Sequence, residues 1–170
     1  MITIYLLRHG ETIENAMGIF QGQMPGHLSD KGKEQARQMH EKVMNLSFDA
    51  VLCSDLQRCK DTASIVLEGM AYTPQYTDLL RERDMGNLVG KPIAGAVFDS
   101  SVEDAPRVNK RIRKFLAGLK EQYEGKTVLV ISHGYYCRLL QAMMENKKNY
   151  KLVPKMDNCE IRRLEWEYPP

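Results

Sequence analysis

Two histidines of this chain each lie one residue after a short apolar segment, with Arg8 before His9 and Ser132 before His133. His9 comes after residues 2–7 and His133 after residues 127–131, and a glycine follows each histidine. A neutral imidazole nitrogen can attack an electrophile near neutral pH without first losing a proton. The repeated pattern predicts two imidazoles that face one anion.

The apolar segments before these histidines indicate what positions them. Runs of this length, aliphatic and without polar alternation, are typical of strands covered on both faces of a parallel sheet. Ligands of such sheets bind at the carboxyl ends of the strands. We expect Gly10 and Gly134 to let the chain turn sharply and to let a ligand come close. His27 and His40 lack this setting and are interpreted as structural or surface residues.

The remaining elements predict an α/β fold, a three-layer sandwich around a mostly parallel central sheet. We expect further strands over residues 49–53 and, at an edge, 159–166, and helices over 106–123 and 135–145. A helix is expected to begin at Ser29, with Ala36, Met39, Val43 and Met44 as its apolar stripe.

The helix after residues 49–53 is expected to be capped by Ser54 or Asp55. Arg58 then falls in its first turn, where free amide groups and partial positive charge suit an anion. The basic residues of the helix over 106–123 are interpreted instead as a solvated face: Arg107, Lys110, Arg111, Arg113 and Lys114.

Composition excludes several classes of partner. The 170 residues carry 24 Lys and Arg against 22 Asp and Glu, a net charge of +2, so no nucleic-acid partner is expected. The apolar runs are shorter than a membrane span and no basic leader precedes the first strand, which predicts a cytoplasmic protein that binds no membrane. The four cysteines lack metal-ligand spacing and are expected to be reduced, mostly buried thiols. No metal or other cofactor is expected, and oligomeric state is left open.

Four motifs resemble the histidine phosphatase superfamily, and more narrowly its phosphoglycerate-mutase-like branch. They are Arg8-His9-Gly10-Glu11-Thr12 with Asn15, Leu28-Ser29-Asp30-Lys31-Gly32 with Gln35-Ala36, Ser54-Asp55-Leu56-Gln57-Arg58 with Thr62-Ala63, and Ser132-His133-Gly134. Their order and spacing match over nearly the whole chain. The resemblance implies one histidine-phosphatase domain over residues 1–170, with a short cap around 83–105.

The resemblance also implies roles for individual residues. His9 is expected to take the phosphoryl group, and Glu82 to give a proton to the leaving oxygen, with Asp84 as an alternative acid. Substrate contacts are expected from Arg8, Gly10, Asn15, Gln21, Gly22, Arg58, His133 and Gly134, of which Arg8, Arg58 and His133 hold the phosphate oxygens.

These residue types suit phosphoryl transfer on physical grounds. The reaction asks the protein for a nucleophile, for positioning and for charge stabilisation. Two arginines can fork onto the equatorial oxygens, and their charge disfavours imidazolium. A carboxylic acid can protonate the departing alkoxide and afterwards activate water.

The predicted function is hydrolysis of small phosphomonoesters. Only residues 90–105 separate the acid-bearing segment from the long helix, and the chain ends four residues after Trp166, which leaves little to close the pocket. A mutase must exclude water, whereas a phosphatase admits it. The alternatives are a phosphoglycerate mutase and a non-catalytic phospho-ligand-binding module, which would not need both a nucleophile and an acid. Substrate choice is expected to depend on residues 93–105, and sugar phosphates, nucleotide-loop phosphates, phosphoglycerate and protein phosphohistidine stay open.

Overall fold

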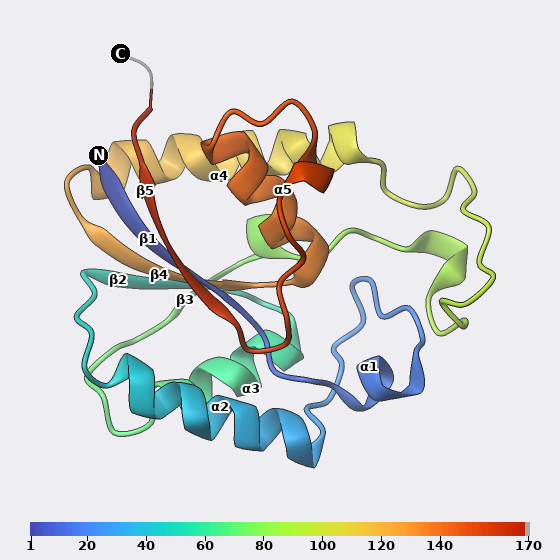
Figure 1. The fold of residues 1–170 in the computed structure, drawn as a ribbon, viewed down its shortest axis with the longest axis horizontal. Helices are drawn as coiled ribbons and strands as arrows, with labels where there is room; N and C mark the ends of the chain where they lie inside the picture. The colour runs from blue at the N-terminus through green and yellow to red at the C-terminus, as the bar shows by residue number, and fades with distance from the viewer. Residues whose placement is uncertain (169–170) are drawn as a thin grey trace.

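The computed structural model describes residues 1–168, and its centre is a five-stranded sheet in the order β3-β2-β4-β1-β5 (Figure 1). The parallel strands are β1 (Ile2–Arg8), β2 (Ala50–Ser54), β3 (Gln75–Thr77) and β4 (Thr127–Ser132). The last strand, β5 (Ile161–Trp166), is antiparallel to β1 at one edge. The predicted mostly parallel sheet is confirmed. The short, largely exposed β3 was not foreseen, because it has no apolar run to reveal it.

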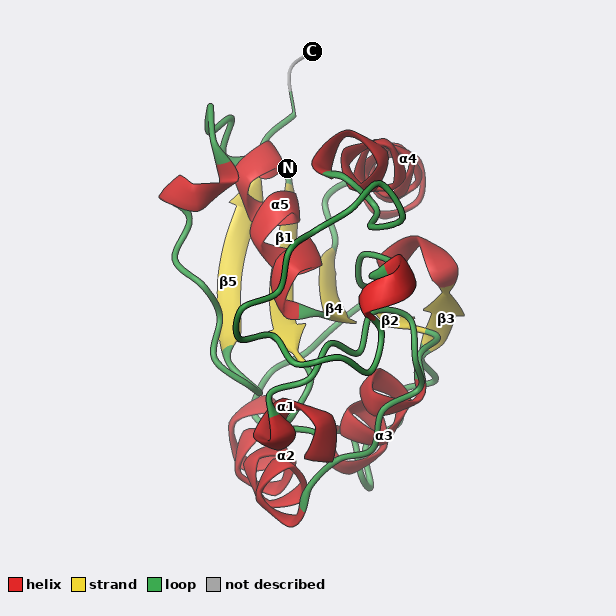
Figure 2. Ribbon diagram, turned by 90° about the vertical axis from the view of Figure 1, so that its right-hand side faces the viewer, coloured by secondary structure: helices red, strands yellow, loops and turns green. Residues whose placement is uncertain are grey.

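Helices cover both faces of the sheet (Figure 2). One face carries α2 (Asp30–Val43) and α3 (Gln57–Val66), and the other carries α4 (Ala105–Tyr123) and α5 (Gly134–Met144). A short helix, α1 (Ile13–Met17), lies beyond the carboxyl end of β1, and 3₁₀ turns occupy Asp78–Leu80, Gly86–Leu88 and Tyr150–Leu152. The expected three-layer sandwich is therefore present.

The central strands divide the core into two clusters. Leu6 and Val130 belong to the cluster that includes residues of α4 and α5, whereas Leu7 and Ile131 belong to the cluster with α2 and α3. Because both faces of β1 and β4 are covered, their sequences read as continuous apolar runs.

The register of β1 and β4 brings the two histidines together. Arg8 pairs with Ser132, so both strands end at the same level. The backbone N–H of His9 then donates to the carbonyl of Ser132 at 3.1 Å. The sheet thus places His9 beside His133, as the sequence predicts.

The helix starts agree with expectation at α2 but not at α3. Ser29 caps α2, where its hydroxyl accepts the N–H of Gly32 at 3.0 Å. At α3 the predicted cap is wrong, because Leu56 holds the cap position and supplies no side-chain bond. Asp55 instead receives two hydrogen bonds of 2.7 Å from Arg81.

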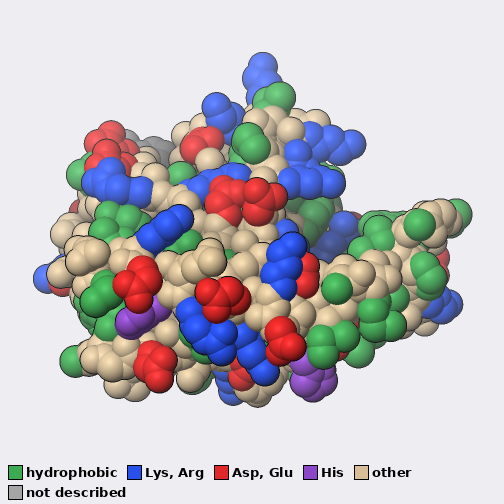
Figure 3. All heavy atoms as spheres, turned by 60° about the horizontal axis from the view of Figure 1, so that its bottom comes forward, with side chains coloured by type: hydrophobic (Ala, Val, Ile, Leu, Met, Phe, Trp, Pro, Cys, Tyr) green, Lys and Arg blue, Asp and Glu red, His purple; other side chains and the backbone are tan. Residues whose placement is uncertain are grey.

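One residue expected in the core of α2 is exposed. Met44, expected in the apolar stripe of α2, is 50% exposed because the helix proper ends at Val43. All four cysteines are free and buried, as expected. Acidic and basic side chains are interspersed over the face that carries α2 and α3 (Figure 3). Within residues 1–168, no helix is long and apolar enough to cross a membrane.

Candidate active site

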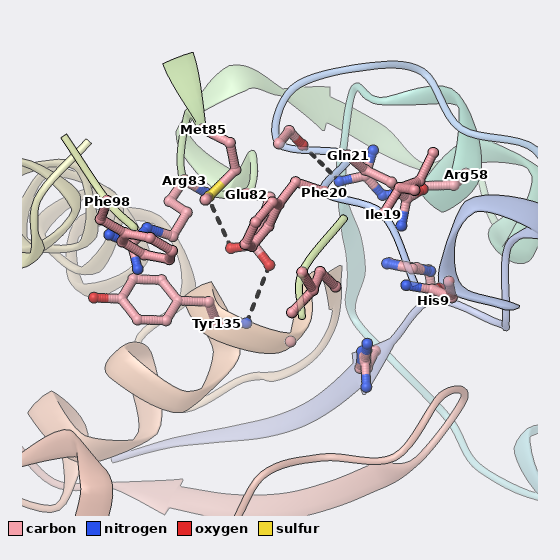
Figure 4. Close-up of a pocket in the computed structure, with 15 residues that line it drawn as sticks. His9, Ile19, Phe20, Gln21, Arg58, Glu82, Arg83, Met85, Phe98 and Tyr135 are labelled. Atoms are coloured by element: carbon pink, nitrogen blue, oxygen red, sulfur yellow. Dashed lines mark hydrogen bonds between the residues drawn. The ribbon is translucent and has the colours of Figure 1, made fainter. Parts of the chain in front are cut away.

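A cavity of about 230 Å³ opens beyond the carboxyl ends of β1 and β4 (Figure 4). It is lined by Arg8, His9, Asn15, Ile19, Phe20, Gln21, Gly22, Arg58, Glu82, Arg83, Met85, Ile93, Phe98, Gly134 and Tyr135. Every site residue predicted from the sequence belongs to this set except Gly10 and His133. We call Arg8, His9 and Arg58 the phosphate end of the cavity.

His9 is held as a neutral imidazole with one defined tautomer. Its Nδ1 lies 2.7 Å from the carbonyl oxygen of Gly10, and since a carbonyl only accepts, Nδ1 carries the proton. The lone pair is therefore on Nε2. Burial, and after it the positive charges of Arg58 and Arg8, lower the pKa of His9 well below its ordinary value. A neutral imidazole with a free lone pair has the chemical form that a nucleophile requires.

Arg58 is a buried cation with its guanidinium fixed by backbone oxygens. The side chain is 1% exposed, and its terminal nitrogens donate to the carbonyls of Gly22, at 2.7 Å, and Met24. The backbone N–H of Arg58 donates to the carbonyl of Pro25 at 3.0 Å. The backbone amide that was expected to be free at the start of α3 is therefore not available to an anion. What Arg58 offers an anion is its guanidinium charge.

Arg8 is held by a backbone carbonyl from the C-terminal part of the chain. Its Nη1 donates to the carbonyl of Met156 at 2.7 Å. A Cβ on Gly134 would lie 3.0 Å from Arg8 Nε, and a Cβ on Gly10 would lie 2.7 Å from the carbonyl oxygen of Gly32. Neither Gly10 nor Gly134 has a positive φ angle. The backbone at Gly10 and Gly134 therefore does not need the conformational freedom of glycine, and the close packing explains why a glycine stands at each position.

His133 is completely buried beside His9 rather than on the cavity wall. The two rings meet edge to face, with centroids 5.3 Å apart and planes at 63°. His133 Nε2 lies 2.8 Å from the hydroxyl oxygen of Ser54. Burial and neighbouring positive charges, Arg58 first, lower the pKa of His133 well below its ordinary value. Contact of His133 or Gly10 with a phosphate stays a prediction.

Asn15 lines the cavity from α1. Its side-chain oxygen accepts hydrogen bonds from the N–H of Thr12 at 3.1 Å and from Asn158 at 3.3 Å. Because the oxygen is engaged, the amide NH₂ is the part of Asn15 left to meet an anion.

Glu82 supplies the carboxyl group of the cavity. Its oxygens accept the backbone N–H groups of Arg83 at 3.0 Å and of Tyr135 and Tyr136 at 3.1 Å, so it rests on the amino end of α5 (Figure 4). Asp84 is exposed, lies outside the cavity wall and binds the N–H of Gly86 at 2.8 Å. Of the two candidate acids, only Glu82 can reach a substrate in this cavity.

The segment that bears Glu82 is anchored by Arg111, which the sequence placed wrongly on a solvated face. Arg111 forms hydrogen bonds of 3.0 and 2.9 Å with the carboxylate of Glu103. It also donates to the carbonyls of Arg81 at 2.9 Å and Glu82 at 3.3 Å. Its side chain is only 21% exposed. A group of basic residues on one helix does not reveal which of them makes a tertiary contact of this kind.

Several lining residues escaped the sequence analysis. They are Ile19, Phe20, Arg83, Met85 and Tyr135. Three of them are direct neighbours of predicted residues, since Phe20 precedes Gln21, Arg83 follows Glu82 and Tyr135 follows Gly134. Ile93 and Phe98 lie in the segment expected to govern specificity. His27, by contrast, is an exposed partner of Glu14, and His40 donates to the carbonyl of Val66, as their structural interpretation requires.

Known proteins share this chain's sequence and fold. The family model of the histidine phosphatase superfamily (branch 1) matches residues 4–169. A probable phosphatase of Schizosaccharomyces pombe is 31% identical over 157 residues, covering 86% of this chain and 75% of the relative. A probable phosphoglycerate mutase of Salmonella choleraesuis is 29% identical over 185 residues, covering 98% and 86%.

A solved structure extends the likeness to three dimensions. The putative alpha-ribazole-5'-P phosphatase from Escherichia coli has a TM-score of 0.82 and 27% identity, with 92% of this chain and 86% of that chain covered. The motifs, the sheet and the family match agree, and the chain belongs to branch 1 of the histidine phosphatase superfamily.

Proposed function

We propose that this protein hydrolyses small phosphomonoesters through a phosphohistidine intermediate on His9. The observation that most supports the proposal is a neutral imidazole, with its free nitrogen on Nε2, beside two fixed guanidinium groups. Such a group attacks phosphorus without a preceding deprotonation. The arginines would stabilise charge that spreads over the phosphoryl oxygens.

In the first step His9 Nε2 forms a bond to phosphorus while the bond from phosphorus to the alcohol oxygen breaks. Glu82 gives its proton to that oxygen, and the alcohol leaves. The proton stays on His9 Nδ1 and keeps its hydrogen bond to the carbonyl oxygen of Gly10, which favours the positive charge that the ring gains.

In the second step water displaces His9 from phosphorus. Glu82, now a carboxylate, takes a proton from the water as the new P–O bond forms. The P–N bond breaks, inorganic phosphate leaves, and both His9 and Glu82 return to their starting states. The three backbone N–H groups on Glu82 would hold its carboxyl group in place for both transfers.

We further propose that the enzyme acts in the cytoplasm on small molecules. Its four cysteines are free thiols, which are typical of reducing compartments. The cavity of about 230 Å³ accommodates a compact ligand rather than a polymer surface.

A phosphoglycerate mutase is the second candidate, because a relative that covers 98% of the chain bears that name. A panel of phosphomonoesters, assayed with a chelator present and with a parallel assay for isomerised phosphoglycerate, separates the two reactions. Release of inorganic phosphate without isomerisation is expected. Isomerisation faster than hydrolysis would instead establish the mutase.

A further inference from the structure

Away from the phosphate end, the cavity wall changes character. Its residues there are Phe20, Met85, Ile93, Phe98 and Tyr135, joined by Arg83, and we call this set the aromatic end. Phe20 and Phe98 meet edge to face, with centroids 5.7 Å apart and planes at 74°. In Figure 4, Phe98 and Tyr135 lie on one side of Glu82, and His9 on the other. A substrate whose phosphate lies at His9 and whose leaving oxygen takes a proton from Glu82 would therefore direct its organic part toward the aromatic end.

The planar guanidinium group of Arg83 forms part of this wall. Its guanidinium carbon lies 4.2 Å from the centroid of the Tyr135 ring and 5.2 Å from that of Phe98. Its Nη2 donates to the carbonyl of Glu103 at 2.9 Å. Two aromatic faces and a carbonyl oxygen thus offset part of its charge, and the planar group adds to the stacking surface.

This environment favours one kind of leaving group over another. A small anionic alcohol would lose water against apolar side chains and lie near the Glu82 carboxyl group. The nearby cation, Arg83, already faces two aromatic rings and donates to the Glu103 carbonyl. A planar ring would bury apolar area and meet aromatic edges and faces in their preferred arrangements. The wall therefore fits an aromatic ring better than a carboxylate or a second phosphate.

We propose that the aromatic end is a leaving-group subsite for phosphomonoesters whose alcohol carries a flat aromatic ring, an inference that rests on the hydrolase function proposed above. Phe98 and Tyr135 are the specificity-determining side chains of this subsite. Phe98 is 49% exposed, so it can be truncated without opening the core.

The test compares kcat/KM for phenethyl, cyclohexylethyl and ethyl phosphate and for phosphoglycerate. The alcohols released from the first three compounds differ little in acidity. Their departure therefore depends on proton donation by Glu82 to a similar extent. Phenethyl phosphate is expected to exceed ethyl phosphate and phosphoglycerate by about tenfold or more, because its ring is buried on binding. It is expected to exceed cyclohexylethyl phosphate, of similar size but without a π face, by about threefold.

Variants test whether the preference for phenethyl phosphate depends on Phe98. Phe98→Ala should remove most of the phenethyl preference, and Phe98→Leu should remove mainly the advantage over the cyclohexyl compound. Val97→Ala, at a neighbouring position that is 83% exposed and outside the cavity, should retain both. Melting temperatures of the variants check that each is folded.

The outcomes separate the two proposals. Absence of turnover with every phosphate would overturn the hydrolase function and the subsite with it. Turnover of all four without ring preference, or a preference that Phe98→Ala leaves intact, would overturn the subsite alone. A preference for phosphoglycerate that Arg83→Gln abolishes would make this end an anion site instead.

Discussion

The phosphate end of the cavity and the segment that bears Glu82 are built in different ways. At the phosphate end, His9 and Arg58 are 2% and 1% exposed, and strand ends and backbone carbonyls fix them. Glu82 belongs to an irregular segment, and its position depends on the amino end of α5 and on the Arg111 anchor. The strands and backbone carbonyls thus hold the proposed nucleophile and its arginine in place, whereas the position of the proposed acid depends on contacts between an irregular segment and the helices.

The largest selective effect is expected at the acid. Glu82→Gln should lower kcat for an alkyl phosphate by about 10²–10⁴-fold, because an alkoxide leaves poorly without a proton. Turnover of an aryl phosphate of low leaving-group pKa should fall much less. Asp84→Asn is the matched control, and a selective defect in that variant would transfer the acid role to Asp84.

A substitution at the phosphate end should lower kcat/KM for the alkyl and the aryl phosphate by the same factor. Arg58→Lys removes the planar fork and is expected to cost about 2–4 kcal/mol of transition-state stabilisation, measured as kcat/KM for the alkyl and the aryl phosphate. Arg37→Lys, on the exposed face of α2, provides the control. A loss below about threefold would be too small for a group that holds the phosphoryl oxygens.

Arg111 tests whether the position of Glu82 depends on the contacts that Arg111 makes with its segment. Arg111→Met should lower alkyl phosphate turnover by about tenfold through displacement of Glu82, with aryl phosphate turnover and vanadate affinity nearly unchanged. Arg111→Lys should recover part of the loss, and Arg113→Met, on the exposed side of α4, should behave like the parent protein. Equal losses on both substrates would mean that Arg111 merely stabilises the fold.

The smallest effect concerns pH. Because burial and the two arginines lower the pKa of His9, the nucleophile should stay neutral, and kcat/KM should stay high, below the pH at which an ordinary histidine protonates. Arg8→Met removes one positive charge, so the pKa of His9 rises and the acid limb should move to higher pH. Ionisation of the substrate affects the parent protein and Arg8→Met equally, so it does not contribute to the difference between their pH profiles. A limb that moves to lower pH would contradict this electrostatic role.

The phosphate end could be predicted from sequence because short apolar runs fix where strands end. Arg8, His9 and Arg58 follow from that periodicity and from motif spacing. The roles of Arg83 and Arg111 could not be predicted, since they depend on how an irregular segment packs against α4 and α5.

Gly10 and Gly134 show a subtler limit of sequence reasoning. The residue type was informative, but the structure gives a reason for it that the sequence analysis did not consider. Neither backbone takes a positive φ angle, and both glycines leave room for neighbouring groups, the Gly32 carbonyl and the Arg8 side chain. Such contacts join segments far apart in the chain, which periodicity and local turn preferences do not describe.

The central claim is that His9 carries the phosphoryl group, and rapid acid-free quenching of turnover with a radiolabelled phosphomonoester tests it most directly. We expect a protein adduct that is stable to base and labile to acid, maps to His9 and is absent from His9→Asn. Label on an aspartate or serine, or full turnover by His9→Asn, would contradict the claim.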